Sequence, residues 1–287
     1  MENEHSNYFD AKNINWNRLW VERHAKRPQS TSEFWNKRAP SFTKHALTTP
    51  YSDEFIKIMR PQADWTVFDM GCGSGTLAWP LSKIVKSVTG CDFSEKMLES
   101  LNERAAAEGL TNINTHLMSW NDDWDAVVPP KSHDVAIASR SMIVSDFAEG
   151  VRKMVRVAKK RVYLSLGVDS GPRDQRLFQA LDRDHGMGMD YMFSHNIIYQ
   201  MGYRPNINMI CTTRQPVYEN EEAAREDLIA VFLKDMQPDE QARFDAFIAE
   251  HLHKVDGGWQ LDYPKTTRWA VIWWDVERDF CPLNAQI

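Results

Sequence analysis

The sequence predicts an α/β protein built on a doubly wound, mostly parallel, seven-stranded sheet, with an N-terminal helical cap and a late helical insertion. Three observations support this fold class. Short apolar runs alternate with helix-like segments between residues 66 and 167, a glycine-rich stretch follows the first run, and two further β-prone runs lie near the C-terminal end. The 287 residues, 43% of them hydrophobic, are enough to bury a sizeable core.

The central part of the chain carries five expected strands with helices between them. The strands are expected at residues 66–70, 87–93, 113–118, 133–139 and 161–167. The helices are expected at residues 76–86, 94–109 and 147–158. Strands that alternate with helices in this way are joined by crossover connections, which give parallel strands.

The flanking regions differ from this pattern, and we expect three parts: 1–60, 61–168 and 169–287. The first is a helical cap rich in aromatic residues, with capping chemistry at Thr31 before the segment FWNKRAPSF. The last contains INMICTT, a charged helical stretch at 221–253 and TRWAVIWWDVE. Its two β-prone runs are expected to pair antiparallel at the sheet edge.

The stretch VFDMGCGSG places Gly71, Gly73 and Gly75 between the first strand and a helix. Glycine lets the backbone approach a ligand closely because no Cβ intrudes, although a tight turn alone also uses glycine. Asp92 ends the next strand about 20 residues on, where a carboxylate accepts hydrogen bonds from ribose hydroxyls. The combination predicts a nucleotide-like cofactor at the carboxyl edge of the sheet. A dinucleotide fingerprint would need its third glycine at Thr76, so the spacing disfavours NAD.

At this point the sequence resembles the class I S-adenosylmethionine-dependent methyltransferases, small-molecule type. The matching segments are VFDMGCGSG, VTGCDFSEKML, THLMSWNDD and HDVAIASRSM, which cover roughly residues 60–168. The first two together are specific and the last two are loose. FWNKRAPSF also looks like the segment that precedes the first strand in many small-molecule members.

The resemblance implies roles for the glycine-rich stretch. Gly71, Gly73 and Gly75, with Cys72 among them, would admit the methionine part of S-adenosylmethionine. Asp69 would hold this loop and face the ammonium group of the cofactor.

The resemblance also assigns the ribose and adenine ends of the cofactor. Asp92 would bind the ribose hydroxyls, or else it caps the following helix. Phe93 and Met97 would line the adenine site. Family members often carry an acid at the end of the third strand, where this chain has Ser119 and Trp120. Trp120 either stacks on adenine or packs in the core.

Candidates for the acceptor side are fewer. Ser139 and Arg140 end the fourth strand, and Arg140 pairs with an anionic acceptor, with the cofactor's carboxylate, or with a surface acid. His185 and His195 lie in a Gly- and Met-rich segment that would shape the acceptor pocket, and they are weak candidates for a general base. No spacing of histidines or cysteines suggests a metal site.

The expected function is methyl transfer to a small molecule by in-line displacement. A sulfonium is an activated donor, so positioning and water exclusion can suffice without a catalytic constellation. A non-catalytic cofactor-binding protein and an NAD-type oxidoreductase are the alternatives. The net charge of -6 disfavours a nucleic-acid partner. Separated cysteines and a polar start, MENEHSNYFD, suggest a cytoplasmic protein without a membrane span.

Overall fold

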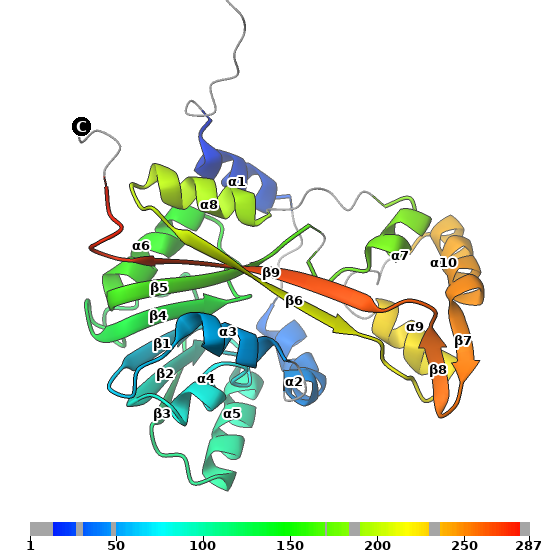
Figure 1. Cartoon of the computed structure of the whole chain (residues 1–287), viewed down its shortest axis with the longest axis horizontal. Coiled ribbons are helices and arrows are strands. Elements are labelled where there is room, and N and C mark those ends of the chain that lie inside the picture. The colour runs from blue at the N-terminus through cyan, green and yellow to red at the C-terminus, as the bar shows by residue number, and fades with distance from the viewer. Residues whose placement is uncertain are drawn as a thin grey trace, which may run out of the picture.

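The computed structural model of the chain describes residues 14–26, 31–46, 50–169, 171–183, 190–229 and 236–281. Its centre is a seven-stranded sheet in the order β3-β2-β1-β4-β5-β9-β6 (Figure 1). The strands are β1 Thr66–Met70, β2 Ser87–Asp92, β3 Ile113–Leu117, β4 His133–Ser139, β5 Ala158–Gly167, β6 Asn206–Arg214 and β9 Lys265–Asp275. Strands β1 to β5 pair in parallel, and β9 pairs antiparallel with both β5 and β6. The predicted fold class is confirmed, with β6 at the edge and β9 inside the sheet.

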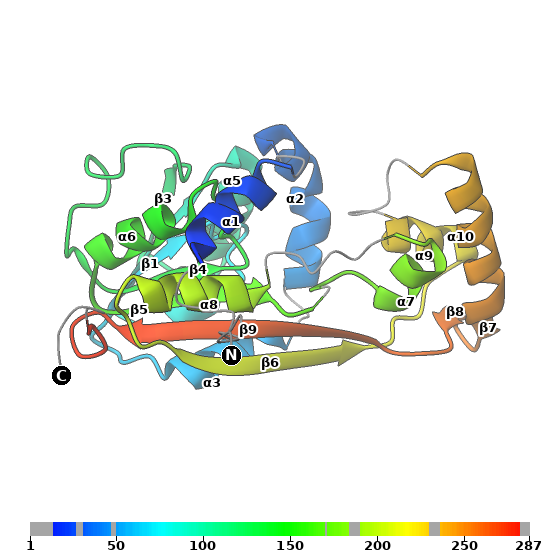
Figure 2. The same ribbon diagram turned by 90° about the horizontal axis from the view of Figure 1, so that it is seen from above.

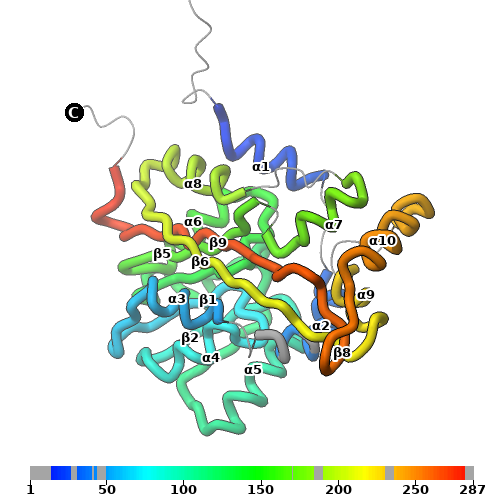
Figure 3. Tube along the Cα trace, turned by 45° about the vertical axis from the view of Figure 1, so that its right-hand side comes forward, coloured from blue at the N-terminus to red at the C-terminus, as the bar shows by residue number. Residues whose placement is uncertain are grey.

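Helices cover both faces of this sheet because its strands are apolar on both sides. Val135 and Ile137 of β4 pack into one core, whereas Ala136 and Ala138 pack into the other. One face carries α3 Tyr51–Met59, α4 Ala78–Ser82 and α5 Glu95–Ala107. The other carries α1 Trp16–His24, α6 Phe147–Val157 and α8 Tyr191–Gln200 (Figure 3). The helix α2 Ser32–Ala46 contacts α5, and the Thr31 hydroxyl accepts a hydrogen bond from Phe34 N, as its capping role predicts.

Helix α4 is shorter than the predicted helix over residues 76–86. The glycine-rich loop continues as turns up to Leu77, so the helix starts only at Ala78. At its other end, Lys86 N donates to Trp65 O, which draws the chain away from the helix and into β2. The helix therefore spans a little over one turn.

The late region is only partly helical, so the prediction of one helical stretch over 221–253 is wrong at its end. It forms α9 Glu221–Ile229 and α10 Pro238–His251, and then β7 Leu252–Val255 and β8 Gly258–Leu261 form a hairpin. Gly257 and Gly258 have positive φ, and Asp-Gly-Gly is a hairpin signal that the sequence contained.

A second, smaller core lies beyond the sheet. It joins α7 Gln175–Ala180 to α9, α10 and the β7–β8 hairpin, and we call these elements the appended subdomain (Figure 1). The β6–β9 pair continues to Arg214 and Lys265, whereas the pairing of β5 with β9 stops at Gly167 and Trp269. A two-stranded ribbon thus extends past the carboxyl end of β5 and carries the appended subdomain (Figure 2).

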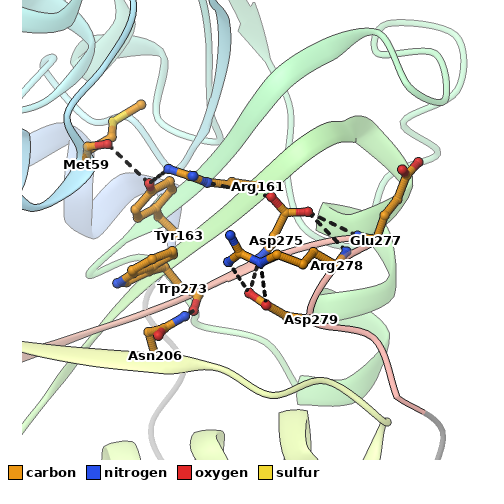
Figure 4. A network of polar contacts seen from close by, with 9 residues as sticks. All are labelled: Met59, Arg161, Tyr163, Asn206, Trp273, Asp275, Glu277, Arg278 and Asp279. Carbon is orange, nitrogen blue, oxygen red and sulfur yellow. Dashed lines mark hydrogen bonds and ion pairs between the residues drawn. The ribbon is translucent and has the colours of Figure 1, made fainter.

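At the opposite end of β9, a polar and aromatic network fixes the strand to the sheet (Figure 4). The rings of Tyr163 and Trp273 stack with centroids 5.8 Å apart, and the Arg161 guanidinium lies 5.4 Å from the Trp273 ring. The Tyr163 hydroxyl donates to Met59 O at 3.3 Å, which adds α3 to the network. No described helix combines the length and apolar character needed to cross a bilayer.

Candidate cofactor and acceptor site

The carboxyl ends of β1, β2 and β4 meet at the point where the chain winds outward in both directions from β1 and β4. The loop after β1 holds Gly71, Gly73 and Gly75, all at positive φ (72°, 55° and 88°). A Cβ on Gly71 would overlap Ser141, and one on Gly75 would overlap the Leu101 side chain. Packing alone therefore requires glycine at position 71, whereas at position 75 the overlap is with the end of the Leu101 side chain.

Gly73 differs from its two neighbours. Its missing Cβ would face only the Phe42 ring of α2, with the nearest ring carbon at 3.3 Å. The loop backbone therefore opens toward α2 at Gly73, and this is the position where a ligand can approach it most closely.

Asp92, at the end of β2, joins the loop to the next strand. Its Oδ2 accepts from Gly73 N at 2.8 Å and its Oδ1 from Ser94 N at 2.9 Å. Burial raises the pKa of Asp92, and these backbone donors partly offset the effect. The cap of α5 is the hydroxyl of Ser94, which accepts from Met97 N. Asp92 therefore does not act as the N-cap of that helix.

Asp69 lies buried near the end of β1. Only 2% of its surface is exposed, and within the described residues no hydrogen bond or ion pair reaches its carboxylate. Burial, followed by the nearby charge of Asp92, raises its pKa to about 7, and Arg140 acts in the opposite direction. A buried acid of this kind is suited to a cationic group of a ligand.

The turn after β4 is held by hydrogen bonds from three directions. Arg140 N donates to Ser165 O at 3.0 Å, and Ser141 Oγ donates to Met70 O at 2.5 Å. Trp120 Nε1 donates to Ser141 O at 2.9 Å. Arg140 itself has a φ of 59°, a strained conformation for a residue with a side chain.

The expected adenine residues lie in two places, after β3 and at the start of α5. Trp120 is half-buried against the core, with its ring centroid 5.2 Å from that of Trp124, and its indole N–H is bonded to the β4 turn. Ser119 N donates to Asp122 Oδ2 at 2.8 Å. Phe93 is half-buried and Met97 is buried at the start of α5. Their contacts with adenine stay a prediction.

Several expectations concern single side chains. Cys72 is buried in the loop, and burial holds the pKa of its thiol well above the ordinary value. Ser139 Oγ lies 2.7 Å from the Tyr51 hydroxyl. His195 lies in α8, where burial lowers its pKa, and no hydrogen bond or ion pair within the described chain joins it to the loop or the β4 turn. His185 lies outside the described residues.

Some residues at the site were not predicted. Asn36 Oδ1 of α2 accepts from Ser94 Oγ at 2.7 Å, and Phe42 faces Gly73. The segment FWNKRAPSF signalled this helix but not these contacts. Trp35, also on α2, is different, because the sequence offered it as a cofactor contact; its Nε1 is buried without a hydrogen-bond partner in the described structure. Tyr51 carried no signal in the sequence.

Comparison with known proteins identifies the family. A model of the methyltransferase domain matches residues 67–161. An uncharacterized protein of Haemophilus influenzae is 32% identical over 249 residues, which covers 85% of this chain and 89% of that protein. The YcgJ protein of Bacillus subtilis has the same fold, with a TM-score of 0.53, 17% identity and coverage of 81% of this chain and 98% of that one.

Relatives with named activities match shorter parts. The ubiquinone biosynthesis O-methyltransferase of Hydrogenovibrio crunogenus is 28% identical over 120 residues, 42% of this chain and 44% of that enzyme. The 23S rRNA (uracil(1939)-C(5))-methyltransferase of Vibrio parahaemolyticus is 26% identical over 155 residues, 52% of this chain and 34% of that enzyme. The chain thus spans less than half the length of these two enzymes. The fold, the family model and the extended match together place the chain in the class I S-adenosylmethionine-dependent methyltransferase family, as an enzyme whose cofactor is S-adenosylmethionine.

Proposed function

We propose that the chain transfers a methyl group to a small-molecule acceptor. The observation that supports this most directly is that α2 and the appended subdomain both lie beyond the carboxyl ends of the parallel strands, the side on which the glycine-rich loop lies (Figure 2). Burial lowers the pKa of Arg38 on α2 and the Asp227 carboxylate on α9 partly offsets this, so the two elements lie within electrostatic reach. A site flanked in this way suits a compact acceptor better than a long polymer.

Charge supports the same proposal. Asp69 and Asp92 are both buried at the site, and the whole chain has a net charge of -6. A phosphate backbone would be repelled by this arrangement, whereas small acceptors need no basic surface.

The residues at the site fit the cofactor. Asp69 would take its ammonium group, Asp92 its ribose hydroxyls, and the backbone at Gly73 would lie against it. The bound cofactor supplies an activated methyl group on a sulfonium. The chain's own part is to hold donor and acceptor in line and to exclude water, for which Phe42 and Trp35 on α2 are well placed.

We expect methyl label from S-adenosylmethionine to enter the small-molecule fraction of a cell extract rather than its RNA fraction. The measurement is incubation of each fraction with the protein and methyl-labelled cofactor, with Asp92→Ala as the control for cofactor-dependent transfer. Label confined to RNA would replace the small-molecule proposal with an RNA acceptor. Cofactor binding with no transfer to either fraction would favour a non-catalytic role.

A second prediction concerns Asp92. Asp92→Ala should weaken binding of S-adenosylhomocysteine by about 10- to 100-fold, because charge-assisted hydrogen bonds contribute roughly 1.5–3 kcal/mol. Since the carboxylate also holds Gly73 N and Ser94 N, the unliganded variant should melt earlier as well. The matched control is Asp146→Ala, which removes the N-cap of α6 at a cost of about 1 kcal/mol and should leave affinity nearly unchanged. Titration calorimetry measures the affinity of both variants, and thermal melts measure their stability. An Asp92→Ala affinity equal to that of the wild type would show that Asp92 does not bind the ribose.

A further inference from the structure

Arg140 stands out among the charged residues of the site because, within the described residues, its guanidinium contacts aromatic rings but no acidic side chain. It lies 4.2 Å from the centroid of the Tyr51 ring and 5.6 Å from that of Trp269. In the described structure, no ion pair reaches it. Burial lowers its pKa, and the charge of Asp69 is close enough to counteract this without forming a contact.

The surrounding structure holds this side chain in place. The Tyr51 hydroxyl donates to Ser165 Oγ at 2.7 Å and lies 2.7 Å from Ser139 Oγ, so the ring beneath the guanidinium is fixed to β4 and β5. The rings of Tyr51 and Trp269 are nearly perpendicular, with centroids 6.1 Å apart. A positive φ at Arg140 costs on the order of 1 kcal/mol, and such strain is typically kept at functional sites.

The position of Arg140 separates it from the ribose end of the cofactor site. Asp92 ends β2, on one side of β1, whereas Arg140 follows β4, on the other side. Its aromatic neighbours come from α3 and β9, which lie outside the matched methyltransferase domain at 67–161. Trp269 also lies where β9 leaves β5 and continues into the ribbon that carries the appended subdomain.

We propose that Arg140 binds a carboxylate of the methyl acceptor, so that the enzyme selects small molecules with a negatively charged group. This inference rests on the proposed function and adds the chemical class of the acceptor. A guanidinium presents paired N–H donors that match a carboxylate. The charge of Asp69, which acts on Arg140, favours a singly charged carboxylate over a doubly charged phosphate.

The test uses binding to the protein saturated with S-adenosylhomocysteine, with benzoate and its neutral analogue benzamide as probes. The wild-type complex should bind benzoate about 10-fold or more tightly than benzamide. Arg140→Gly should remove this preference, and glycine accepts the positive φ, so the variant should fold without backbone strain. Arg140→Lys keeps the positive charge but loses the paired N–H donors of the guanidinium, and it should give an intermediate preference for benzoate. Arg152→Gln, which removes an exposed cation from α6, is the matched control and should behave as wild type.

Two further arms identify the source of the carboxylate. S-adenosylhomocysteine carries a carboxylate, whereas 5′-methylthioadenosine does not. If Arg140 binds the acceptor and not the cofactor, Arg140→Gly should leave the affinity for both nucleosides unchanged. A selective loss of S-adenosylhomocysteine affinity would mean that Arg140 binds the cofactor's own carboxylate, which overturns the proposal. No preference for benzoate in the wild type, or a preference retained in Arg140→Gly, would also overturn it. These experiments measure binding, whereas the proposed function is tested by methyl transfer. A failure of the carboxylate proposal can therefore be distinguished from a failure of the proposed function.

Discussion

Asp69→Asn should stabilise the unliganded protein at pH 8 and at the same time weaken cofactor binding severely. The Asp69 pKa of about 7 lies above the ordinary value of 3.8, so the unfolded chain loses this proton first. Stability conferred by the protonated form is complete below pH 4 and is lost as the pH rises through about 7. The asparagine variant does not titrate in this range, so at pH 8 its free energy of unfolding should exceed that of the wild type by about 4 kcal/mol. Denaturant unfolding at pH 5 and pH 8 measures it, with the exposed Asp64→Asn as control.

Cofactor binding by the wild type should have the opposite pH dependence. A bound ammonium group favours the carboxylate form of Asp69, so binding must release the proton that the free protein holds below about pH 7. The dissociation constant should rise about tenfold for each pH unit below that value. In Asp69→Asn, binding should be weak and nearly independent of pH. A wild-type affinity that stays constant between pH 5.5 and 8 would show that Asp69 does not meet the ammonium group.

Gly71→Ala should lower the stability of the protein far more than Gly73→Ala does. The added Cβ would overlap Ser141, whose hydroxyl bonds to Met70 O, so either the loop or the β4 turn must move. We expect about 2–4 kcal/mol, which combines the strain of a positive φ with overpacking. Gly73→Ala has a similar φ but would meet only Phe42 at 3.3 Å, and should cost about 1 kcal/mol.

A double variant separates the overlap from the backbone strain. Ser141→Gly removes the Cβ that an alanine at position 71 would strike, so the two changes together should cost less than the sum of the single changes. Chemical denaturation of the two single variants and the double variant gives the free energies of unfolding needed for this double-mutant cycle. Equal costs for Gly71→Ala and Gly73→Ala, or strict additivity in the cycle, would refute the overlap.

Much of the sheet, and the loop at which we propose that the cofactor binds, could be predicted from the sequence because their signals are local. The first five strands and the residues Asp69, Gly73 and Asp92 stand in short segments with a regular spacing. The reason for Gly71 and Gly75 could not be predicted, because Ser141 and Leu101 approach them only in the folded chain. The packing of Tyr51 and Trp269 against Arg140 could not be predicted for the same reason.

The position of β9 inside the sheet has a consequence for how the chain folds during synthesis. β9 lies between β5 and β6, although it leaves the ribosome after every other strand of this sheet. Until it emerges, β5 has an open hydrogen-bonding edge and β6 has no neighbour. An incomplete chain therefore carries an unprotected strand edge, the kind of surface that leads to aggregation and recruits chaperones. Residues 265–275 thus complete the sheet, and a nascent chain that stops before them cannot form its native strand order.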